Sequence, residues 1–462
     1  MKEVSSRCSK GRAQMGIKEQ VYLYSPVFMQ NLLTTLYGYR LQRERYGPAY
    51  QRRFQELADK LEKPIDVELD QLTRLNTFLL FCQQHSAYYN TLFKDLNLQL
   101  PFQTLTELRQ IPSLEKETLR QQIESIRTDL DAPILGKTGG TTGKSIQVRY
   151  TKEDMQVRMA HLDFFKATHG VKKGMRRISF TAQALVSERQ QKPVYWRMNH
   201  ALNQMLFTVK KLSPETMTAY LQAIDRFDPE SIDGLPSAMI ELAYHAKRIG
   251  MELQCRPRAI FPTAEMMTST ERKLIEDVFH APVFDQYASS EGAPIVSECR
   301  FGNKHLHYEM GIIEIEPDGQ ILVTSFDTHG TPLVRYRVGD RMTSSGKTCS
   351  CGHAGPVIDS IDGRGRGYIV KQNGQKVFEG QLSSLVKALP NSVERVQYIQ
   401  NSERDITFLY IPDRTRFLSE HEEQLYRFLK TLLGAEMNVS LRAVDNIPRE
   451  VSGKTLLVKQ LM

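Results

Sequence analysis

The run Gly136-Lys-Thr-Gly-Gly-Thr-Thr-Gly-Lys-Ser145 concentrates glycine, threonine and lysine in one short segment. Glycine lets backbone N–H groups approach a phosphate closely, while hydroxyls and an ammonium group neutralise its charge. The run is not a Walker A loop, because that motif requires Gly where this chain has Thr138. The following segment, Ser145-Ile-Gln-Val-Arg-Tyr150, alternates apolar and polar residues and predicts a strand. We therefore expect a glycine-rich flap over a triphosphate between two strands, with a ligand-free hairpin loop as the alternative.

The length and composition of the chain predict a multidomain globular protein. With 462 residues it exceeds what one ordinary core accommodates. Its 40% apolar and 25% charged residues, without low-complexity tracts, are typical of soluble proteins. The sequence contains no uninterrupted apolar stretch of about 18 residues, so we expect no transmembrane helix. Its start is polar and basic, so we expect no signal segment. The six cysteines do not suggest a disulfide framework, so we expect a cytoplasmic location.

The net charge of +8 is concentrated near the N-terminus. Residues 1–60 hold eleven Lys and Arg against five Asp and Glu, which gives +6. No basic stripe is interleaved with stacking aromatic residues, so we expect no nucleic-acid partner. A solvated, disordered tail over residues 1–20 is the first interpretation, and docking to a surface or membrane is the second. The apolar segment Tyr22–Tyr37 predicts a helix with Pro26 in its first turn.

The order of periodic segments predicts a large α/β domain over residues 21–364. Residues 50–130 have helical patterns, for example Asp70–Ser86. Between about 130 and 340, strand patterns alternate with helical ones, which is typical of layered α/β folds. The expected elements are strands Arg177–Thr181, Arg258–Pro262 and Pro282–Tyr287, helix Pro214–Asp225, and a hairpin of Gly311–Glu316 and Gln320–Ser325 around the turn Pro317-Asp-Gly319.

The run Gly363-Arg-Gly-Arg-Gly367 predicts a hinge, because three of its five residues are glycine. Beyond it, residues 365–462 predict a small, mobile α+β domain. Its expected elements are a hairpin around Asn373-Gly374, helices Gln381–Ala388 and Glu420–Leu433, and strands Val393–Gln400 and Asp405–Ile411. The predicted fold class is thus α/β, with a large multi-layer N-terminal domain and a small C-terminal lid.

Five segments in a fixed order carry a resemblance to a known family. They are Thr138–Ser145, Asp285–Glu291, Pro332–Asp340, Gly363-Arg364 and Pro448–Lys454. In this order the chain resembles the adenylate-forming superfamily of acyl-CoA ligases. It is most similar to the phenylacetate–CoA ligase-like family, in its branch associated with capsular polysaccharide genes. The resemblance covers nearly the whole chain, and the five motifs together are far more specific than any one of them.

The resemblance implies a reaction and a set of residues. A carboxylate attacks the α-phosphate of ATP to give an acyl-adenylate and pyrophosphate, and coenzyme A then accepts the acyl group. Lys454 is expected to be catalytic, Glu291 to hold Mg²⁺, and Asp340 to bind the ribose hydroxyls. The expected ATP- and AMP-binding residues are Thr138, Gly139, Gly140, Thr141, Thr142, Gly143, Lys144, Ala264, Glu265, Gln286, Tyr287, Ser289, Ser290, Asp340 and Arg364.

The chain departs from the family pattern mainly in the hinge. The family usually has Gly-Arg-x-Asp-Asp, whereas this chain has Arg366 and Gly367 at the two acidic positions. This change makes the coenzyme A step less certain than the adenylation step. One alternative is an adenylating enzyme that passes the acyl group to a sugar, amine or carrier thiol in polysaccharide or secondary-metabolite biosynthesis. A second alternative is a non-catalytic nucleotide-binding protein. A small carboxylic acid is the expected substrate, and a homodimer is possible.

Three cysteines and a histidine predict a structural zinc site. Cys349-Ser-Cys351-Gly follows the hairpin 311–325, and Cys299 precedes it together with His305. Three thiolates and an imidazole are a suitable ligand set for tetrahedral zinc. His307 competes with His305 as the fourth ligand. The alternative is a set of reduced cysteines without metal.

Overall fold

The computed structural model describes most of the chain. The described residues are 17–62, 65–137, 146–181, 183, 185–187, 190, 193–265, 267, 269–344, 346–362, 368–378, 382, 392–412, 417–445, 447 and 457–461. They divide into two compact units. The larger unit comprises Asn31–Thr138 and Ile146–Arg364, and the smaller comprises Met1–Gln30, Gly139–Ser145 and Gly365–Met462. The mixed α/β fold with a separate C-terminal unit confirms the fold class expected from the sequence.

A five-stranded sheet in the larger unit has the order β4-β5-β3-β6-β7. Its strands are β3 (Arg177–Thr181), β4 (Trp196–Asn199), β5 (Gln204–Thr208), β6 (Ser231–Gly234) and β7 (Ala259–Pro262). All neighbouring pairs are parallel except β4 with β5. Parallel neighbours require long crossover connections, which include the helices α9 (Pro214–Phe227) and α10 (Pro236–Ile249). Strands β3 and β7 and helix α9 confirm three of the predicted elements.

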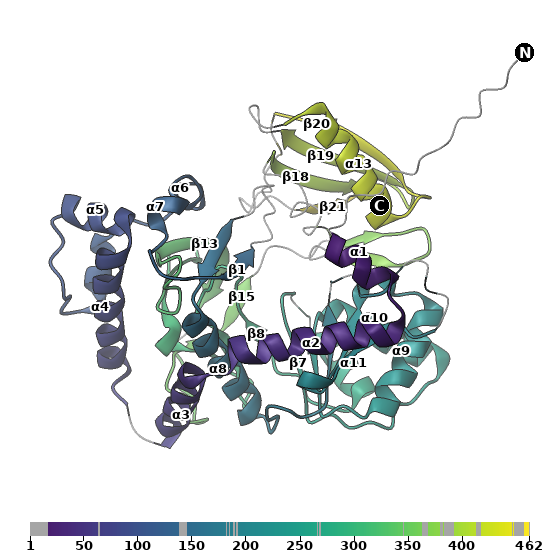
Figure 1. Cartoon of the computed structure of the whole chain (residues 1–462), viewed down its shortest axis with the longest axis horizontal. Coiled ribbons are helices and arrows are strands. Elements are labelled where there is room, and N and C mark those ends of the chain that lie inside the picture. Colours follow the sequence, from purple (N-terminus) through teal and green to yellow (C-terminus); the bar gives the residue numbers. More distant parts are fainter. Residues whose placement is uncertain are drawn as a thin grey trace, which may run out of the picture. The chain divides into compact units, whose positions relative to one another are not determined.

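One hydrophobic core joins this sheet to its helices. It contains side chains from β3, β5, β6 and β7 and from α9, α10 and α11 (Ser269–Phe279). Tyr220, Leu242 and Ile275 are fully buried in it. Helix α9 begins at Pro214 because the Ser213 hydroxyl accepts a hydrogen bond from a first-turn N–H. Figure 1 shows the three helices grouped together.

Two four-stranded antiparallel sheets complete the strand layers of the larger unit. One has the order β11 (Gly311–Ile315), β12 (Gln320–Ser325), β13 (Leu333–Thr343) and β15 (Ser360–Asp362). The other has the order β14 (Val357–Ile358), β10 (Lys304–Leu306), β9 (Val296–Glu298) and β8 (Gln286–Tyr287). The predicted hairpin 311–325 is confirmed. Gly319 in its turn has φ +83° and donates its N–H to the Glu316 carbonyl at 2.8 Å.

Helices and one short strand pair surround these sheets. They are α2 (Val27–Arg45), α3 (Pro48–Glu62), α4 (Val67–His85), α5 (Ala87–Asp95), α6 (Lys116–Gln121), α7 (Ile123–Ile126) and α8 (Lys152–Thr168), with β1 (Ile134–Lys137) antiparallel to β2 (Gln147–Tyr150). Helix α4 confirms the predicted helix Asp70–Ser86. Its buried residues Leu75, Phe78 and Leu79 pack with β12 and β13 in a second core. No helix in the described part of the chain is both long and apolar enough to cross a bilayer.

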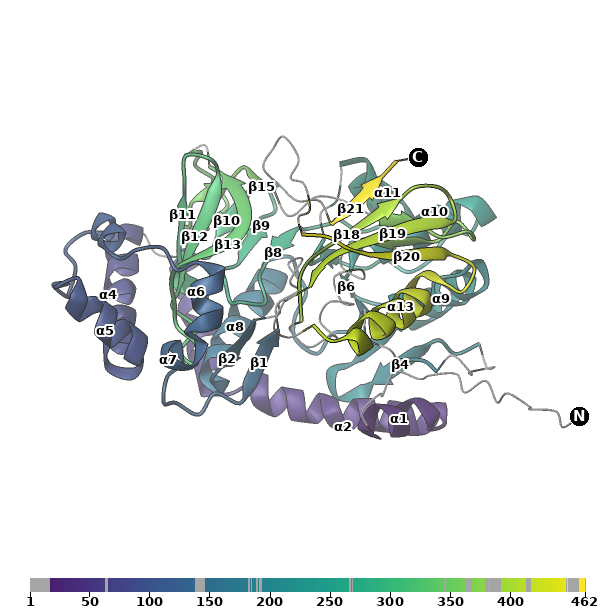
Figure 2. The same cartoon turned by 90° about the horizontal axis from the view of Figure 1, so that it is seen from above.

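The smaller unit contains a mixed four-stranded sheet and a covering helix. The strand order is β20 (Asn438–Ala443), β19 (Asp405–Pro412), β18 (Val393–Gln400) and β21 (Val458–Gln460). Helix α13 (Ser419–Leu433) lies along this sheet (Figure 2) and buries Leu425, Leu429 and Leu433. The unit also holds α1 (Ile17–Tyr24) and the hairpin of β16 (Tyr368–Val370) and β17 (Lys376–Phe378). The predicted hairpin, both strands and the last helix are confirmed, while the predicted helix 381–388 lies outside the described residues except for Leu382.

Two predicted elements differ from the structure. The segment Tyr22–Tyr37 is not one helix, because α1 ends at Tyr24 and α2 begins at Val27. Pro26 separates the two, since proline disfavours a helical conformation of the residue before it. Of the predicted strand Pro282–Tyr287, only Gln286–Tyr287 pairs as a regular strand, and Val283 makes an isolated parallel bridge to Ile260.

We predict that Gly234→Ala destabilises the larger unit far more than Gly250→Ala. Both glycines have positive φ, but a Cβ at Gly234 would lie 2.2 Å from the Phe180 carbonyl oxygen, whereas Gly250 has open space around it. Backbone strain alone costs about 1 kcal/mol at Gly250, and the added clash raises the cost at Gly234 to about 3 kcal/mol. Thermal unfolding of both variants measures the difference. Equal unfolding temperatures would contradict the observed packing of β3 against β6.

Candidate functional site

The turn Ser289–Gly292 is held by two residues of the β2–α8 segment. The Tyr150 hydroxyl donates a hydrogen bond to the Ser290 carbonyl at 2.8 Å. The Arg158 guanidinium, which is buried, donates to the carbonyls of Gly292 at 2.9 Å and Ala293 at 3.2 Å. Gly292 has φ +95°, and a Cβ there would lie 2.8 Å from the Tyr150 hydroxyl. The conformation of the turn is therefore fixed from both sides of its backbone.

Glu291 occupies the centre of this turn. Its side chain is 7% exposed. Within the described part of the chain, no hydrogen bond or ion pair to its carboxylate is found. Burial raises the pKa of Tyr150. The Arg158 charge acts to lower this pKa, and the Glu291 charge acts to raise it. A buried carboxylate that has no partner among the described residues is a suitable ligand for a hard cation such as Mg²⁺.

Tyr287 and Asp340 contact each other across two sheets. Tyr287 is the last residue of β8, and Asp340 lies in β13. The Tyr287 hydroxyl donates a hydrogen bond to Asp340 Oδ2 at 2.9 Å. Oδ1 of the same carboxylate has no partner among the described residues. One oxygen is thus oriented by the protein, and the other can accept a hydroxyl group.

The segment before Tyr287 runs beside β7. Val283 bridges Ile260 in parallel, with Phe284 N–H donating to the Ile260 carbonyl at 2.9 Å. Residues after Val283 and residues after β7 therefore leave the sheet at the same edge. Carboxyl ends of parallel strands are where ligands bind in open α/β sheets. This pairing brings Ala264 and Glu265 to the same edge as Gln286 and Tyr287.

Ala264 and Glu265 form a constrained turn at this edge. Ala264 has φ +70°, a left-handed conformation that costs energy in a residue other than glycine. Glu265 Oε2 accepts a hydrogen bond from Ser237 N–H in the first turn of α10 at 3.0 Å, and burial raises the pKa of this carboxyl. Glu265 Oε1 and Gln286 Oε1 are buried without a hydrogen-bond partner among the described residues. Two unpartnered oxygens at one sheet edge indicate an incomplete polar site.

Buried Glu298 fixes the backbone that precedes Tyr287. Its carboxylate accepts two hydrogen bonds from Arg272 Nη1, at 2.9 and 3.0 Å, and one from Asp285 N–H at 2.9 Å. Arg272 also donates to the Val283 carbonyl. Burial acts to lower the pKa of Arg272, but the Glu298 charge outweighs it and raises this pKa. Helix α11 and strand β9 thus clamp residues 283–285 together.

The glycine-rich run and two other predicted residues lie outside the described residues. These are 138–145, Arg364 and Lys454. The two strands predicted around the run are confirmed, since β1 and β2 pair with Lys137 opposite Gln147. Strand β1 touches the Glu291 turn, because a Cβ at Gly136 would lie 2.5 Å from the Ser290 carbonyl oxygen.

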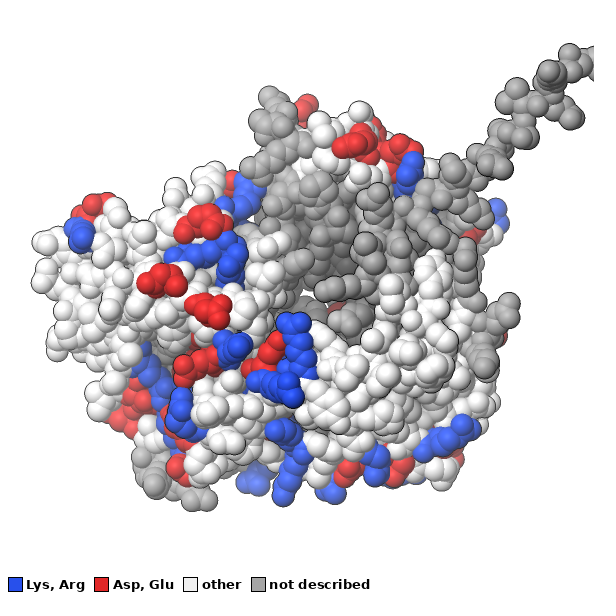
Figure 3. Space-filling view, viewed as in Figure 1, with Lys and Arg blue, Asp and Glu red and all other residues white. Residues whose placement is uncertain are grey.

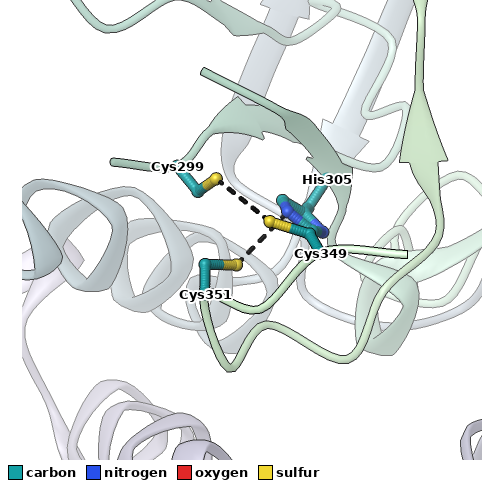
Figure 4. A group of neighbouring side chains, drawn as sticks. All are labelled: Cys299, His305, Cys349 and Cys351. Carbon is teal, nitrogen blue, oxygen red and sulfur yellow. Dashed lines mark hydrogen bonds between the residues drawn. The ribbon is translucent and has the colours of Figure 1, made fainter. Parts of the chain in front are cut away.

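Cys299, His305, Cys349 and Cys351 form one cluster (Figure 4). Their ligand atoms all lie within 4.8 Å of one another. Cys299 Sγ is 3.7 Å from Cys349 Sγ, and Cys351 Sγ is 3.3 Å from His305 Nε2. Cys299 follows β9 directly, His305 lies in β10, and the other two cysteines precede β14. The pairing of these three strands brings the four residues together, and the cluster could hold a metal ion.

The surroundings of the cluster suit a metal. His305 Nδ1 lies 3.0 Å from the Gly355 carbonyl, so that nitrogen carries the proton and leaves Nε2 as the ligand atom. Burial acts to raise the pKa of Cys349, but hydrogen bonds, first from the Cys351 backbone, outweigh it and lower this pKa to about 6. Burial raises the pKa of Cys351 to about 12. One thiolate is therefore available at neutral pH before a metal binds.

His307 is not part of the cluster. Its Nδ1 lies 3.0 Å from His161 Nδ1, and its Nε2 lies 2.7 Å from the Ser297 hydroxyl. Burial lowers the pKa of His307 to about 3, which keeps the ring neutral. Between the two histidines that the sequence left open, the geometry selects His305.

Tyr150 and Arg158, which hold the Glu291 turn, were not predicted from the sequence. Arg158 belongs to a polar stripe of α8 with Asp154 and His161, and all three are buried. The spacing i, i+4 and i+7 is that of one helix face. A polar face of a helix is normally exposed to solvent. The sequence therefore gave no signal that these three residues are buried.

Comparisons with known proteins identify relatives of this chain. A family model described as the CapK C-terminal domain matches residues 369–460. Protein CapK of Staphylococcus aureus is 30% identical over 440 residues, which cover 94% of this chain and 97% of that protein. Phenylacetate-coenzyme A ligase of Thermus thermophilus is 23% identical over 433 residues, which cover 84% of this chain and 95% of that protein.

Solved structures share the fold. The crystal structure of 2-hydroxyisobutyryl-CoA ligase in complex with 2-HIB-AMP and CoA has a TM-score of 0.55 at 17% identity, covering 91% of this chain and 92% of that one. A second structure of that ligase, in an open conformation, has a TM-score of 0.52 at 16% identity, covering 84% and 90%. From its relatives, its fold and its site, the chain belongs to the CapK family, a phenylacetate–coenzyme A ligase-like branch of the adenylate-forming ligases.

Proposed function

We propose that this adenylate-forming ligase activates a small carboxylic acid with ATP and Mg²⁺ and passes the acyl group to coenzyme A. The observation that carries the adenylation step is the Tyr287–Asp340 hydrogen bond beside the buried Glu291 turn. Adenylation requires an oriented nucleotide and charge stabilisation at its phosphates. The described residues provide an acceptor for hydroxyl groups, Asp340 in β13, and a cation ligand, Glu291 in the turn after β8.

Glu291 holds Mg²⁺ in this proposal. The ion neutralises phosphate charge during attack by the substrate carboxylate and departure of pyrophosphate. Tyr150 and Arg158 act as positioning residues, because their hydrogen bonds to the backbone of the turn keep the Glu291 carboxylate in one place.

Asp340 binds the ribose hydroxyls of the nucleotide through the oxygen that Tyr287 leaves available. The remaining members of the ATP site are assigned by resemblance to the family. The run 138–145 surrounds the phosphates with backbone N–H groups and hydroxyls. Lys454 neutralises charge at the α-phosphate and substrate carboxylate, and Arg364 adds a contact to the nucleotide. Ala264 and Glu265 form the wall beside the adenine, which is consistent with the left-handed backbone of Ala264 and the hydrogen bond that Glu265 accepts from Ser237.

Coenzyme A is the proposed acceptor because it is named in phenylacetate-coenzyme A ligase and in 2-hydroxyisobutyryl-CoA ligase, two of the proteins compared above. Because the hinge lacks the two acidic residues of the family, the alternative acceptor is a sugar, an amine or a carrier thiol. In either case the bond that forms joins the acyl carbon to the acceptor, and AMP leaves with the electron pair of the cleaved C–O bond.

Zinc is the proposed occupant of the cysteine–histidine cluster. Three thiolates and one imidazole are the common ligand set of closed structural zinc sites. The cluster lies directly after Glu298, whose carboxylate holds the backbone before Tyr287. The metal therefore supports the sheet on which the nucleotide-binding residues lie and takes no part in the reaction.

We predict that the protein catalyses ATP–pyrophosphate exchange with one or more acids of a carboxylic acid panel. Lys454→Ala should reduce exchange by about 100-fold or more, because a charge-stabilising contact in the transition state is lost. Glu291→Gln should raise the Mg²⁺ concentration needed for half-maximal exchange.

Addition of coenzyme A, with thioester detection by mass spectrometry, then identifies the acceptor.

The control for these variants is Lys459→Ala, which removes an exposed lysine of β21 from the same C-terminal segment. This variant should retain exchange. Exchange by Lys454→Ala at the wild-type rate would refute the assigned role of Lys454. Exchange without thioester formation would favour the alternative acceptors.

Tyr287→Phe should raise the KM for ATP about five- to tenfold and leave kcat nearly unchanged. The variant removes the hydroxyl that orients Asp340, and one such hydrogen bond contributes about 1 kcal/mol. Steady-state kinetics with the acid that supports exchange measures both constants. Tyr308→Phe is the matched control, since the Tyr308 hydroxyl pairs with Lys60 instead. A fall in kcat with unchanged KM would contradict a role in nucleotide orientation.

Purified protein should contain one zinc ion per chain by elemental mass spectrometry. The double variant Cys349→Ser/Cys351→Ser should lose the metal and unfold at a lower temperature, because half of the ligands are removed. Cys255→Ala, which removes a buried thiol outside the cluster, should retain the zinc. A wild-type protein prepared without chelator and free of metal would refute the zinc site.

A further inference from the structure

Helix α2 exposes an apolar stripe. Leu32, Leu36 and Tyr39 are 49%, 55% and 52% exposed and follow one another at helical spacing. Arg43 continues the same face and is also exposed. Single exposed apolar residues are ordinary, but a contiguous stripe marks an interaction surface.

Another face of α2 attaches the helix to its unit, largely through polar contacts. Thr34 and Gly38 are buried there, and a Cβ at Gly38 would lie 2.1 Å from Asn199 Oδ1. Asn31 Oδ1 accepts a hydrogen bond from Met198 N–H at 3.0 Å. Thr35 Oγ1 accepts one from His200 N–H at 3.2 Å.

The usual surface helix buries its apolar face, whereas about half of the surface of Leu32, Leu36 and Tyr39 on α2 stays exposed. At about 100° per residue, this stripe lies about 150° from the face of Thr34 and Gly38. The exposed parts of these side chains take no part in the attachment of the helix. Neither the nucleotide-binding residues nor the cysteine cluster involves α2, so the proposed function leaves the stripe unexplained.

A surface groove adjoins the stripe. It has a volume of about 460 Å³ and is lined by Leu36, Tyr39, Arg40, Arg43, Glu44 and Lys152. Arg40 pairs with Glu44 at 2.7 Å, so the lining keeps a net charge of +2. Figure 3 shows uncharged surface along much of α2, with Lys and Arg gathered toward its C-terminal end. The groove thus combines apolar walls with an excess of positive charge.

We propose that this face of α2 docks the protein on an anionic lipid surface. The apolar stripe enters the boundary between headgroups and acyl chains, and Arg40, Arg43 and Lys152 contact the phosphates. Tyrosine suits such a boundary, because its ring is apolar and its hydroxyl remains hydrated. The excess charge of +6 within residues 1–60 supports the same partner.

Charge complementarity selects a lipid surface over a second copy of this chain. A twofold contact through the same face would add a second set of Arg40, Arg43 and Lys152 and supply no compensating excess of anions. An anionic membrane supplies both an apolar layer that suits the stripe and phosphate charge that suits the basic lining of the groove.

Vesicle co-sedimentation of the full chain tests this proposal. Vesicles of phosphatidylcholine with phosphatidylglycerol should bind the protein at least about tenfold more tightly than phosphatidylcholine alone. The binding should weaken with added salt, because exposed charges are screened. Leu36→Ser/Tyr39→Ser should reduce the binding about tenfold or more. Arg40→Glu/Arg43→Glu should abolish the preference for phosphatidylglycerol.

The matched control is Tyr244→Ser/Ile249→Ser, which removes one exposed tyrosine and one exposed aliphatic residue from α10. This variant should bind as the wild type does. Thermal unfolding and sedimentation velocity of every variant report its folding and oligomeric state. Absence of vesicle binding, or equal binding by the stripe variant and the control, would overturn the proposal. A dimer that only the stripe variant loses, without vesicle binding, would assign the face to a second copy.

Discussion

The buried carboxylate of Glu298 connects the parts of the larger unit on which the candidate site depends. It binds Arg272 of α11 and the backbone of Asp285, and the next residue, Cys299, belongs to the cysteine cluster. A buried charge of this kind is tolerated only when it is fully paired. Removing Glu298 would leave Arg272 without its main partner and release the segment that leads to Tyr287. Glu298 therefore connects the cysteine cluster to the segment that leads to Tyr287.

The candidate site is assembled at strand ends from distant segments. Ala264 follows β7, Tyr287 ends β8, and Asp340 comes from the other antiparallel sheet. The parallel bridge between Ile260 and Val283 and the hydrogen bond between Tyr287 and Asp340 bring these segments together. Such an arrangement can orient a nucleotide before reaction, which reduces the entropy lost in reaching the transition state.

Two helices show the limit of sequence periodicity. On α2 three apolar residues at helical spacing are exposed, whereas on α8 three polar residues at helical spacing are buried. Periodicity shows which residues share a face, whereas burial depends on which partners the rest of the chain provides. Arg158 is buried because it finds backbone carbonyls of the Glu291 turn. Leu36 is exposed because Gly38, on the opposite face, permits the close approach to Asn199.

The sequence by itself determined the features that depend on local chemistry. Turn residues predicted the hairpin 311–325, alternation predicted the strand that follows 138–145, and ligand types predicted that Cys299, His305, Cys349 and Cys351 lie together. The tertiary structure alone decided between His305 and His307, since His161 and Ser297 engage His307 and strand pairing brings His305 to the cysteines. It also decided that Tyr150 and Arg158 hold the Glu291 turn. These choices depend on contacts between residues far apart in the chain, which local patterns do not encode.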